Sequence, residues 1–336
     1  MEIPLKHEFN RYLDAVQPTR PQRNLAKDEL GFLESRLSEY IRDDDPFKFV
    51  KALRSGSFAK ATALRRSESA DFDADMAVYV EVVDASSTEV ANLIAYVEKL
   101  ARRAYKARTT RRPRFEPNDS CVRIAFRVTP KINIDVVPIV AIQHRSIPNW
   151  GVLPKRDGTR CHTSVSEHIE FVQSRNNQEH GVPFRKLIRL LKVWRNGAFS
   201  GPMQAKVRSF LLELLLGKAY DERKQNLTGE ALRDLSTLIS WIIGHELAAP
   251  IYFPDNRVPI ETKPHVGPVV VLDPVNRDDN VAADWTHADR DEFLDRLDEL
   301  RDLLRDAEIE IGDDLDRAID FVDQALPNFR NFSEAR

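Results

Sequence analysis

Asp73-Ala74-Asp75-Met76-Ala77-Val78-Tyr79-Val80 is the segment that decides the fold, because it sets two carboxylates at the start of an apolar β-strand. Side chains two residues apart on a strand project from one face, so Asp73 and Asp75 are expected to point the same way. A third acid, Asp135, interrupts a second β-branched run, Ile132-Asn133-Ile134-Asp135-Val136-Val137-Pro138. Three carboxylates within about 4 Å repel by roughly 4 kcal/mol per pair at an effective dielectric constant of ~20, so they must protonate or share cations.

Divalent metal is the remedy that this acidic pattern favours. Two Mg²⁺ ions about 3.5–4 Å apart would activate a hydroxyl and stabilise a leaving pyrophosphate, with Mn²⁺ as an expected substitute. Asp71 precedes the pair, and we expect it in the loop before the strand as a solvated or capping carboxylate. The pattern therefore indicates metal-dependent phosphoryl chemistry on Asp73, Asp75 and Asp135.

Composition sets the context for this site. The 336 residues are enough for two domains, and 50 Lys and Arg against 53 Asp and Glu give a net charge of −3, which argues against a protein that coats nucleic acid. Cys121 and Cys161 are too few for a disulfide framework, which fits a reducing cytoplasm. Neither a signal peptide nor an apolar run long enough to span a bilayer is evident, so we expect a soluble cytoplasmic protein with no membrane partner.

The pattern of apolar residues predicts a mixed α+β half followed by a helical half. Residues 24–54 carry apolar residues at helical spacing and predict one long amphipathic helix, and residues 122–128 with the Asp135 run predict a β-hairpin. Residues 148–161 are loop-like, and the pattern beyond them is helical. We therefore predict an N-terminal helix plus core over residues 1–160 and a helical lobe over residues 161–336 that completes the active-site cleft.

A short loop precedes the two acids. In Gly56-Ser57 the glycine allows backbone N–H groups to approach a phosphate closely, and the serine hydroxyl can donate to it. A bare Gly-Ser is more often an ordinary turn. Its position before Thr62 and the Asp-x-Asp pair favours a triphosphate cradle, whereas a Walker-type P-loop is absent from the sequence.

Six motifs in order resemble one known family. They are Ser55-Gly56-Ser57-Phe58-Ala59-Lys60-Ala61-Thr62-Ala63-Leu64, Asp73-Ala74-Asp75, Ile134-Asp135-Val136-Val137-Pro138, Leu191-Lys192-Val193-Trp194, Arg208-Ser209-Phe210-Leu211-Leu212-Glu213-Leu214-Leu215 and Leu272-Asp273-Pro274-Val275-Asn276-Arg277-Asp278-Asp279-Asn280-Val281. Together they resemble the bacterial relatives of cyclic GMP-AMP synthase and oligoadenylate synthetase, the cyclic-oligonucleotide synthases of anti-phage signalling systems. The resemblance implies a polymerase-β-like nucleotidyltransferase core with a helical second lobe.

The resemblance also implies roles for individual residues. Asp73, Asp75 and Asp135 would hold two Mg²⁺ and Asp135 would help deprotonate the attacking hydroxyl. The remaining nucleotide-binding residues would be Gly56 and Ser57 at the donor phosphates, Thr62 in the same loop, Lys192 and Ser209 at the triphosphate and Phe210 against a base. The expected partners are nucleoside triphosphates including ATP, a regulatory protein or nucleic-acid activator, and a separately encoded effector that the product activates.

Two departures from the family pattern concern the loop. Ala61 stands where the family usually has glycine before the threonine, which predicts a stiffer loop. The spacing from Thr62 to Asp73 is a few residues longer than in the family, and Arg65-Arg66-Ser67-Glu68-Ser69 fills it. Neither departure removes a metal ligand.

Several features have competing interpretations. Phe210 fits a core position as well as base stacking. The basic stripe of Arg185, Arg189 and Lys192 could be a solvated helix face. A basic stretch could contact a regulator or simply end a helix; its members are Arg102, Arg103, Lys106, Arg108, Arg111, Arg112 and Arg114. The histidines, among them His162, His168, His180 and His245, lack the i, i+4 pairing typical of zinc sites.

The leading hypothesis is an enzyme that joins nucleoside triphosphates, releases pyrophosphate and closes a cyclic di- or trinucleotide. One alternative is a terminal nucleotidyltransferase that modifies RNA or a protein hydroxyl. Another, of a different class, is a catalytically inactive nucleotide-binding scaffold, whose expected mark, loss of one of the three acids, is absent.

Overall fold

The computed structural model divides the chain into two compact units, a sheet unit of residues 17–170 and a helical unit of residues 1–16 with 171–336. The structure describes residues 5–42, 45–65, 72–82, 87–106, 108, 112–116, 118–127, 131–144, 147–176, 181–255 and 265–333. Asp71, Arg111, His180 and residues 66–70 therefore lie outside the described part. No helix among the described residues is both long and apolar enough to cross a bilayer.

The sheet unit is built on seven strands. Their bounds are β1 Phe47–Ser55, β2 Phe72–Val82, β3 Arg114–Glu116, β4 Val122–Phe126, β5 Ile132–Ala141, β6 Trp150–Pro154 and β7 Arg160–Ser164. The order along the sheet is β1-β2-β5-β4-β3, and β6 pairs with β5 and β7. Only the β2–β5 pair is parallel among these pairings. The predicted β4–β5 hairpin pairing is confirmed.

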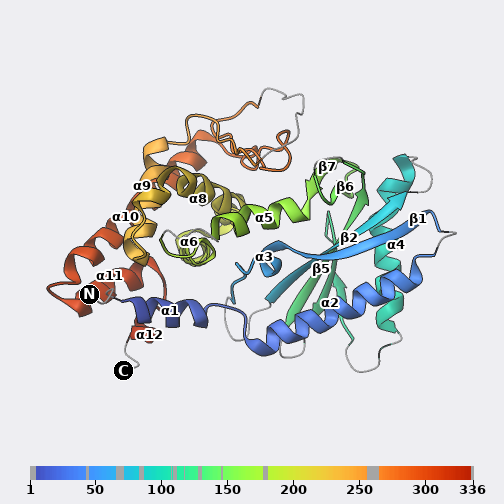
Figure 1. Cartoon of the computed structure of the whole chain (residues 1–336), viewed down its shortest axis with the longest axis horizontal. Coiled ribbons are helices and arrows are strands. Elements are labelled where there is room, and N and C mark those ends of the chain that lie inside the picture. The colour runs from blue at the N-terminus through green and yellow to red at the C-terminus, as the bar shows by residue number, and fades with distance from the viewer. Residues whose placement is uncertain are drawn as a thin grey trace. The chain divides into compact units, whose positions relative to one another are not determined.

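One face of this sheet is covered by two long helices, α2 (Arg20–Tyr40) and α4 (Ser87–Lys106) (Figure 1). Alternate β2 residues, from Phe72 to Val80, pack with Leu33 and Val97 in the core of this face. Period-2 alternation then turns the acids of β2 to the opposite face. The short helix α3 (Gly56–Ala59) connects β1 toward β2.

The single helix predicted for residues 24–54 is wrong in its second half. Helix α2 ends at Tyr40, and residues 47–55 form strand β1, which pairs antiparallel with β2. The apolar side chains of β1 are mostly half-buried, and such a short run cannot be assigned to helix or strand from periodicity alone. Pairing with β2 decides the outcome.

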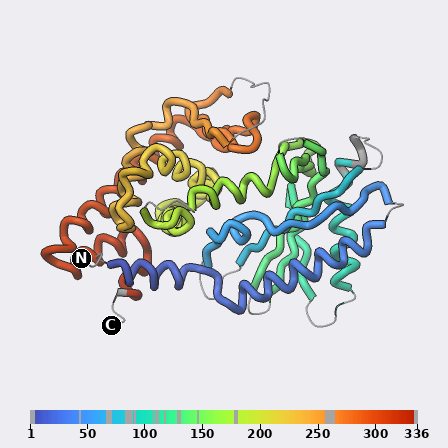
Figure 2. Tube along the Cα trace, viewed as in Figure 1, coloured from blue at the N-terminus to red at the C-terminus, as the bar shows by residue number. Residues whose placement is uncertain are grey.

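The helical unit surrounds its own large apolar core. Its elements are α1 Lys6–Ala15, α6 Phe184–Ala198, α7 Gly201–Lys206, α8 Ser209–Arg223, η1 Lys224–Asn226, α9 Ala231–His245, α10 His287–Glu310, α11 Leu315–Ala325 and α12 Arg330–Ser333, and α5 Val165–Asn176 crosses the unit boundary. Within this unit the first helix packs on the last ones, as the blue and red ends of the tube show (Figure 2). The Phe9 and Phe329 rings lie 4.7 Å apart, and the Tyr12 hydroxyl donates to the Pro327 carbonyl.

This division differs from the predicted one in two places. Residues 1–16 belong to the helical unit, because their aromatic side chains pack on the C-terminal helices. The boundary falls at residue 170 and not at 160, since residues 150–164 form the β6–β7 hairpin of the sheet. A hairpin rich in glycine and proline has the local composition of a loop.

Candidate active site

Strand pairing brings the three predicted acids together on one sheet face. In the parallel register of β2 and β5, Asp75 lies opposite Asp135, and Asp73 lies opposite Asn133. Asp73 and Asp75 are half-buried, and Asp135 is 9% exposed. The face carries these polar groups because Ala74, Met76, Ile134 and Val136 turn the other way into the α2–α4 core.

The Gly56-Ser57 loop meets this acidic face directly. Ser55 pairs with Asp75 across β1 and β2, and Gly56 follows with φ +61°. A β-carbon on residue 56 would lie 2.5 Å from the Cγ of Asp75 and closer still to its Oδ2. Only glycine permits this approach, so the sequence motif and the acid form one structural unit.

The rest of the loop is closed by its own backbone. The Thr62 N–H donates to the Ser57 carbonyl at 2.9 Å, and Thr62 is 0% exposed, so it shapes the turn that presents Gly56 and Ser57. Ala61 adopts φ +55°. The family's glycine preference before the threonine therefore has a conformational cause, because a left-handed residue costs alanine about 1–2 kcal/mol.

Asn133 also lies beside the acids and is not among the residues predicted for the site. Its Nδ2 donates to Asp73 Oδ1 at 2.9 Å, and its Oδ1 is buried without a hydrogen-bond partner among the described residues. The spacing in the sequence could have predicted this position, since Asn133 stands two residues before Asp135 and must share its face of the strand. An unpaired buried amide oxygen beside three acids is suited to a cation.

Arg123 also joins the site without having been predicted. It lies opposite Asp135 in the antiparallel β4–β5 register, and its Nε and Nη2 donate to the two carboxylate oxygens at 2.8 and 2.5 Å. The hydrogen bonds to Asp135 raise the pKa of Arg123 above its ordinary value. Burial and the Asp135 carboxylate raise the pKa of the neighbouring Cys121 thiol, so this thiol stays protonated.

The acid set fits a hard divalent cation in its donor atoms, which are carboxylate and amide oxygens. As the side chains stand, no group of three or more His, Cys, Asp and Glu within the described ranges is arranged to hold a metal ion. Asp135 is turned to Arg123, and Asp73 accepts from Asn133.

The other predicted nucleotide-binding residues belong to the helical unit. Lys192 lies on α6 and is 6% exposed, while Ser209 and Phe210 begin α8. Phe210 is half-buried and packs against the helical core. In the basic stripe Arg185 is exposed, whereas Lys192 and Arg189 are buried, and burial lowers the pKa of Arg189 to about 10.

The late Asp-Pro loop stabilises itself. Asp273 accepts from the backbone N–H groups of Val275 and Asn276, while Asn280 Oδ1 accepts from Val271 and Ala282. These bonds satisfy the buried polar groups of an irregular segment.

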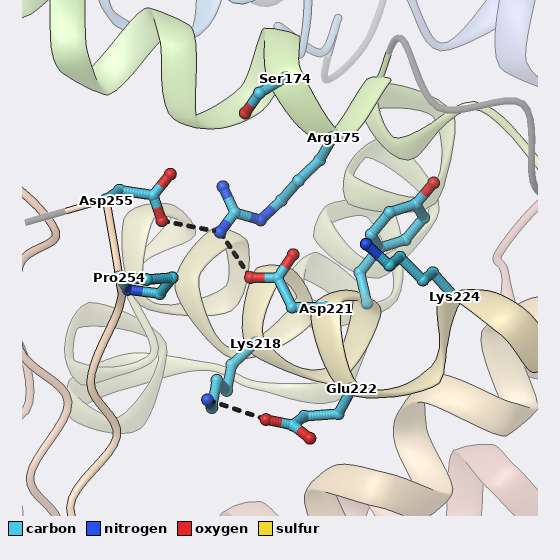
Figure 3. Close-up of a pocket in the computed structure, with 9 residues that line it drawn as sticks. Ser174, Arg175, Lys218, Asp221, Glu222, Lys224, Pro254 and Asp255 are labelled. Atoms are coloured by element: carbon cyan, nitrogen blue, oxygen red, sulfur yellow. Dashed lines mark hydrogen bonds and ion pairs between the residues drawn. The ribbon is translucent and has the colours of Figure 1, made fainter.

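A separate cavity of about 360 Å³ lies wholly within the helical unit (Figure 3). The Arg175 guanidinium stands between Asp221 and Asp255, at 2.6 and 3.0 Å, and lies 3.8 Å over the Phe171 ring. Burial raises the pKa of Asp221. Arg175 thus joins α5 to α8 and to the segment at residue 255. The ion cluster that lines the cavity is therefore structural.

Three members of the basic stretch that is a candidate regulatory contact are engaged inside the sheet unit. Arg102 pairs with Glu98 and lies over the Phe115 ring, and Arg103 lies over the Tyr40 ring. Arg108 donates to the buried Glu29. These contacts favour the interpretation as a helix end.

Comparison with known families identifies the family of this chain. The model of the SMODS family, the Second Messenger Oligonucleotide or Dinucleotide Synthetase domain, matches residues 3–176, which is more than half of the chain. The chain belongs to this family. The resemblance drawn from the six motifs is thereby confirmed, and members of this family generally use divalent metals.

Individual proteins that are similar to this synthetase agree with the family assignment. The Cyclic AMP-AMP-AMP synthase of Escherichia coli (strain MS 115-1) is 28% identical over 292 residues, which cover 84% of each chain. The CBASS oligonucleotide cyclase CdnC of E. coli (strain KTE188) is 26% identical over 294 residues, 87% of this chain and 88% of that one. This chain is accordingly a nucleotidyltransferase that makes a cyclic oligonucleotide second messenger from nucleoside triphosphates.

Solved structures confirm the predicted α+β fold, a nucleotidyltransferase core with helices in the second unit. The structure of E. coli MS115-1 CdnC with ATP aligns at TM-score 0.76 and 23% identity, covering 97% of this chain and 98% of that one. The Vibrio cholerae DncV cyclic AMP-GMP synthase with a linear intermediate aligns at TM-score 0.68 and 16% identity, covering 96% and 95%.

Proposed function

We propose that this synthetase uses ATP as a substrate and closes a cyclic di- or trinucleotide on a site formed by Asp73, Asp75 and Asp135 with two Mg²⁺ ions. The observation that supports it best is the pairing of Asp75 with Asp135 in a parallel register, with Gly56 packed against the Asp75 carboxylate. This arrangement concentrates three negative charges next to a loop of backbone N–H groups. The carboxylates are suited to bind metal ions, and the backbone N–H groups of the loop are suited to bind phosphate.

Each residue of the site has its own role in this proposal. Asp73, Asp75 and Asp135, with the Asn133 amide oxygen, hold the cations, which when bound lower the pKa of the attacking ribose hydroxyl and neutralise the leaving pyrophosphate. The backbone at Gly56 and the Ser57 hydroxyl orient the donor phosphates, and Thr62 keeps that loop closed. Asp135 is the carboxylate assigned to accept the hydroxyl proton.

The helical unit supplies the remaining nucleotide contacts in this proposal. Lys192 is a compact ammonium suited to a triphosphate, and Ser209 is a hydroxyl donor at the start of α8. The half-buried Phe210 offers its ring to a base, at roughly 1–3 kcal/mol per stacked base. Replacing Lys192 with alanine should raise KM for nucleotide more than it lowers kcat.

Regulation and location complete the proposal. The E. coli CdnC is described in a complex with HORMA-deltaN, which supports a regulatory protein partner for this chain as well. The product would activate an effector encoded elsewhere, in anti-phage defence. Neither Cys121 nor Cys161 forms a disulfide, which fits a reducing cytoplasm, where nucleoside triphosphates are available.

The site assignment is tested by replacing Asp73 and Asp75 together with asparagine. Pyrophosphate release from ATP and Mg²⁺, with no added acceptor, should fall below detection while the thermal unfolding transition is kept. Asp119→Asn is a matched control, since Asp119 is an exposed acid of the same unit, and its activity should be unchanged. Normal turnover in the double variant would contradict the site, and turnover that requires added RNA would favour a terminal transferase.

A further inference from the structure

Arg123 and Asp135 form the closest charged contact of the acidic face. Two adjacent strands, β4 and β5, place the residues opposite each other, and the guanidinium binds both carboxylate oxygens in a parallel fork. Such bidentate pairs are the strongest of the common charge-assisted hydrogen bonds. The pair is thus set by the strand register and not by a chance surface rotamer.

The environment of the pair strengthens it. The side chain of Asp135 is 12% exposed and that of Arg123 is 32% exposed, so water screens the carboxylate only weakly. Arg123 also feels the charge of Asp73, which contributes to its raised pKa. Its single positive charge therefore offsets part of the repulsion between Asp135 and Asp73.

A divalent cation would need the same carboxylate. Asp135 cannot turn its oxygens fully toward Asp75 while both accept from Arg123, and no set of three acidic or other metal-ligating side chains in the described part is now arranged around a cation. A guanidinium next to a dication also repels it. Occupation of the site and the Arg123–Asp135 fork are therefore opposed.

We propose that Arg123 is a resident counter-ion of the acidic face that competes with divalent metal for Asp135. It keeps the three carboxylates compatible with a folded sheet when no metal is bound, and it raises the metal concentration at which the site fills. Arg123 in this view is a positioning residue. The inference rests on the proposed function only in taking Asp135 as a metal ligand.

The test is Mn²⁺ binding without nucleotide, measured by titration calorimetry and by the rise in Tm on adding Mn²⁺ to chelator-treated protein. Arg123→Gln should bind Mn²⁺ about tenfold more tightly, have a lower Tm in chelator, and show a larger Mn²⁺-induced rise. Arg123→Lys, which keeps the charge but loses the fork, should bind with an affinity between those of the wild type and Arg123→Gln. If Arg123→Gln is too unstable to measure, the Mn²⁺ affinity of Arg123→Lys relative to the wild type is the test of the inference.

A matched control separates this effect from simple loss of charge. Arg127 directly follows β4 and pairs with Glu116, and both side chains are half-exposed. Arg127→Gln should leave Mn²⁺ affinity unchanged. Unchanged or weaker Mn²⁺ binding in the Arg123 variants would overturn the inference, whereas unchanged Mn²⁺ binding in Asp135→Asn would overturn the metal site of the proposed function.

Discussion

Gly56 and Asp75 lie in such close contact that residue 56 has no room for a β-carbon: that atom would stand 2.5 Å from the Asp75 Cγ. The contact joins the end of β1 to the acids of β2, because Ser55 and Asp75 are paired in the sheet. The loop expected to hold phosphate and an acid expected to hold metal are therefore positioned by each other.

Gly56→Ala should reduce turnover at least 100-fold, because Asp75 must move and a displacement of about 1 Å can cost ~10²-fold in rate. Part of the stability loss, about 1–2 kcal/mol, comes from the positive φ alone. Gly201→Ala isolates that part, since Gly201 has φ +56° with nothing near its missing β-carbon. Equal activity in the two variants, measured by pyrophosphate release, would argue against the contact.

Ala61→Gly should be neutral or stabilising by up to about 1 kcal/mol in denaturant unfolding of the sheet unit. Ala61 is exposed and has φ +55°, so glycine relieves backbone strain while adding unfolded-state entropy. Ala95 is exposed on helix α4, and Ala95→Gly should instead destabilise by roughly 0.5–1 kcal/mol. Similar losses in both variants would show that residue 61 is not strained.

The acidic site could be predicted from sequence more completely than the elements around it. An i, i+2 pair on an apolar strand fixes the face of Asp73 and Asp75, and the same rule applied to Asp135 also indicates Asn133. Arg123 could not be found this way, because the sequence predicts the β4–β5 hairpin but not its register, and only the register places Arg123 opposite Asp135.

The errors in the predicted elements and unit boundaries have similar physical causes. The sequence of β1 does not distinguish a strand from a helix, because its identity depends on pairing with β2. Nothing local in residues 1–16 reveals that Phe9 and Tyr12 pack on Phe329, more than 300 residues away. Long-range packing overrides local propensity in both cases.

Asn133→Ala should lower kcat about tenfold and raise the Mg²⁺ concentration needed for half-maximal rate. Asn133 orients Asp73 through a 2.9 Å hydrogen bond, and residues that orient metal ligands typically contribute 10–100-fold. Asn118→Ala, which removes a turn contact to the Ser120 N–H in the same unit, is the control. An unchanged Mg²⁺ dependence would leave Asn133 without a role in the site.

Asp289→Asn should cost the helical unit about 1 kcal/mol at neutral pH. Hydrogen bonds from Lys206 and then from Thr286 lower the pKa of Asp289 to about 2. A lowered pKa stabilises the folded state above the unfolded value near 4, and this contribution is lost as the pH falls from about 4 toward 2. Unfolding free energies measured across that range should therefore converge for variant and wild type, and a constant difference would contradict the assignment.

The most direct test of the central claim is mass spectrometry of the product made from ATP, alone and with the other nucleoside triphosphates, in Mg²⁺ and with any activating partner present. One fixed set of acids can serve successive transfers only if the intermediate returns its triphosphate to the donor position, so ring closure ends the reaction. The account predicts a phosphatase-resistant product with no terminal phosphate, which is absent in the Asp73→Asn, Asp75→Asn variant. Linear oligomers with intact triphosphates as the only product of the fully active enzyme would contradict it.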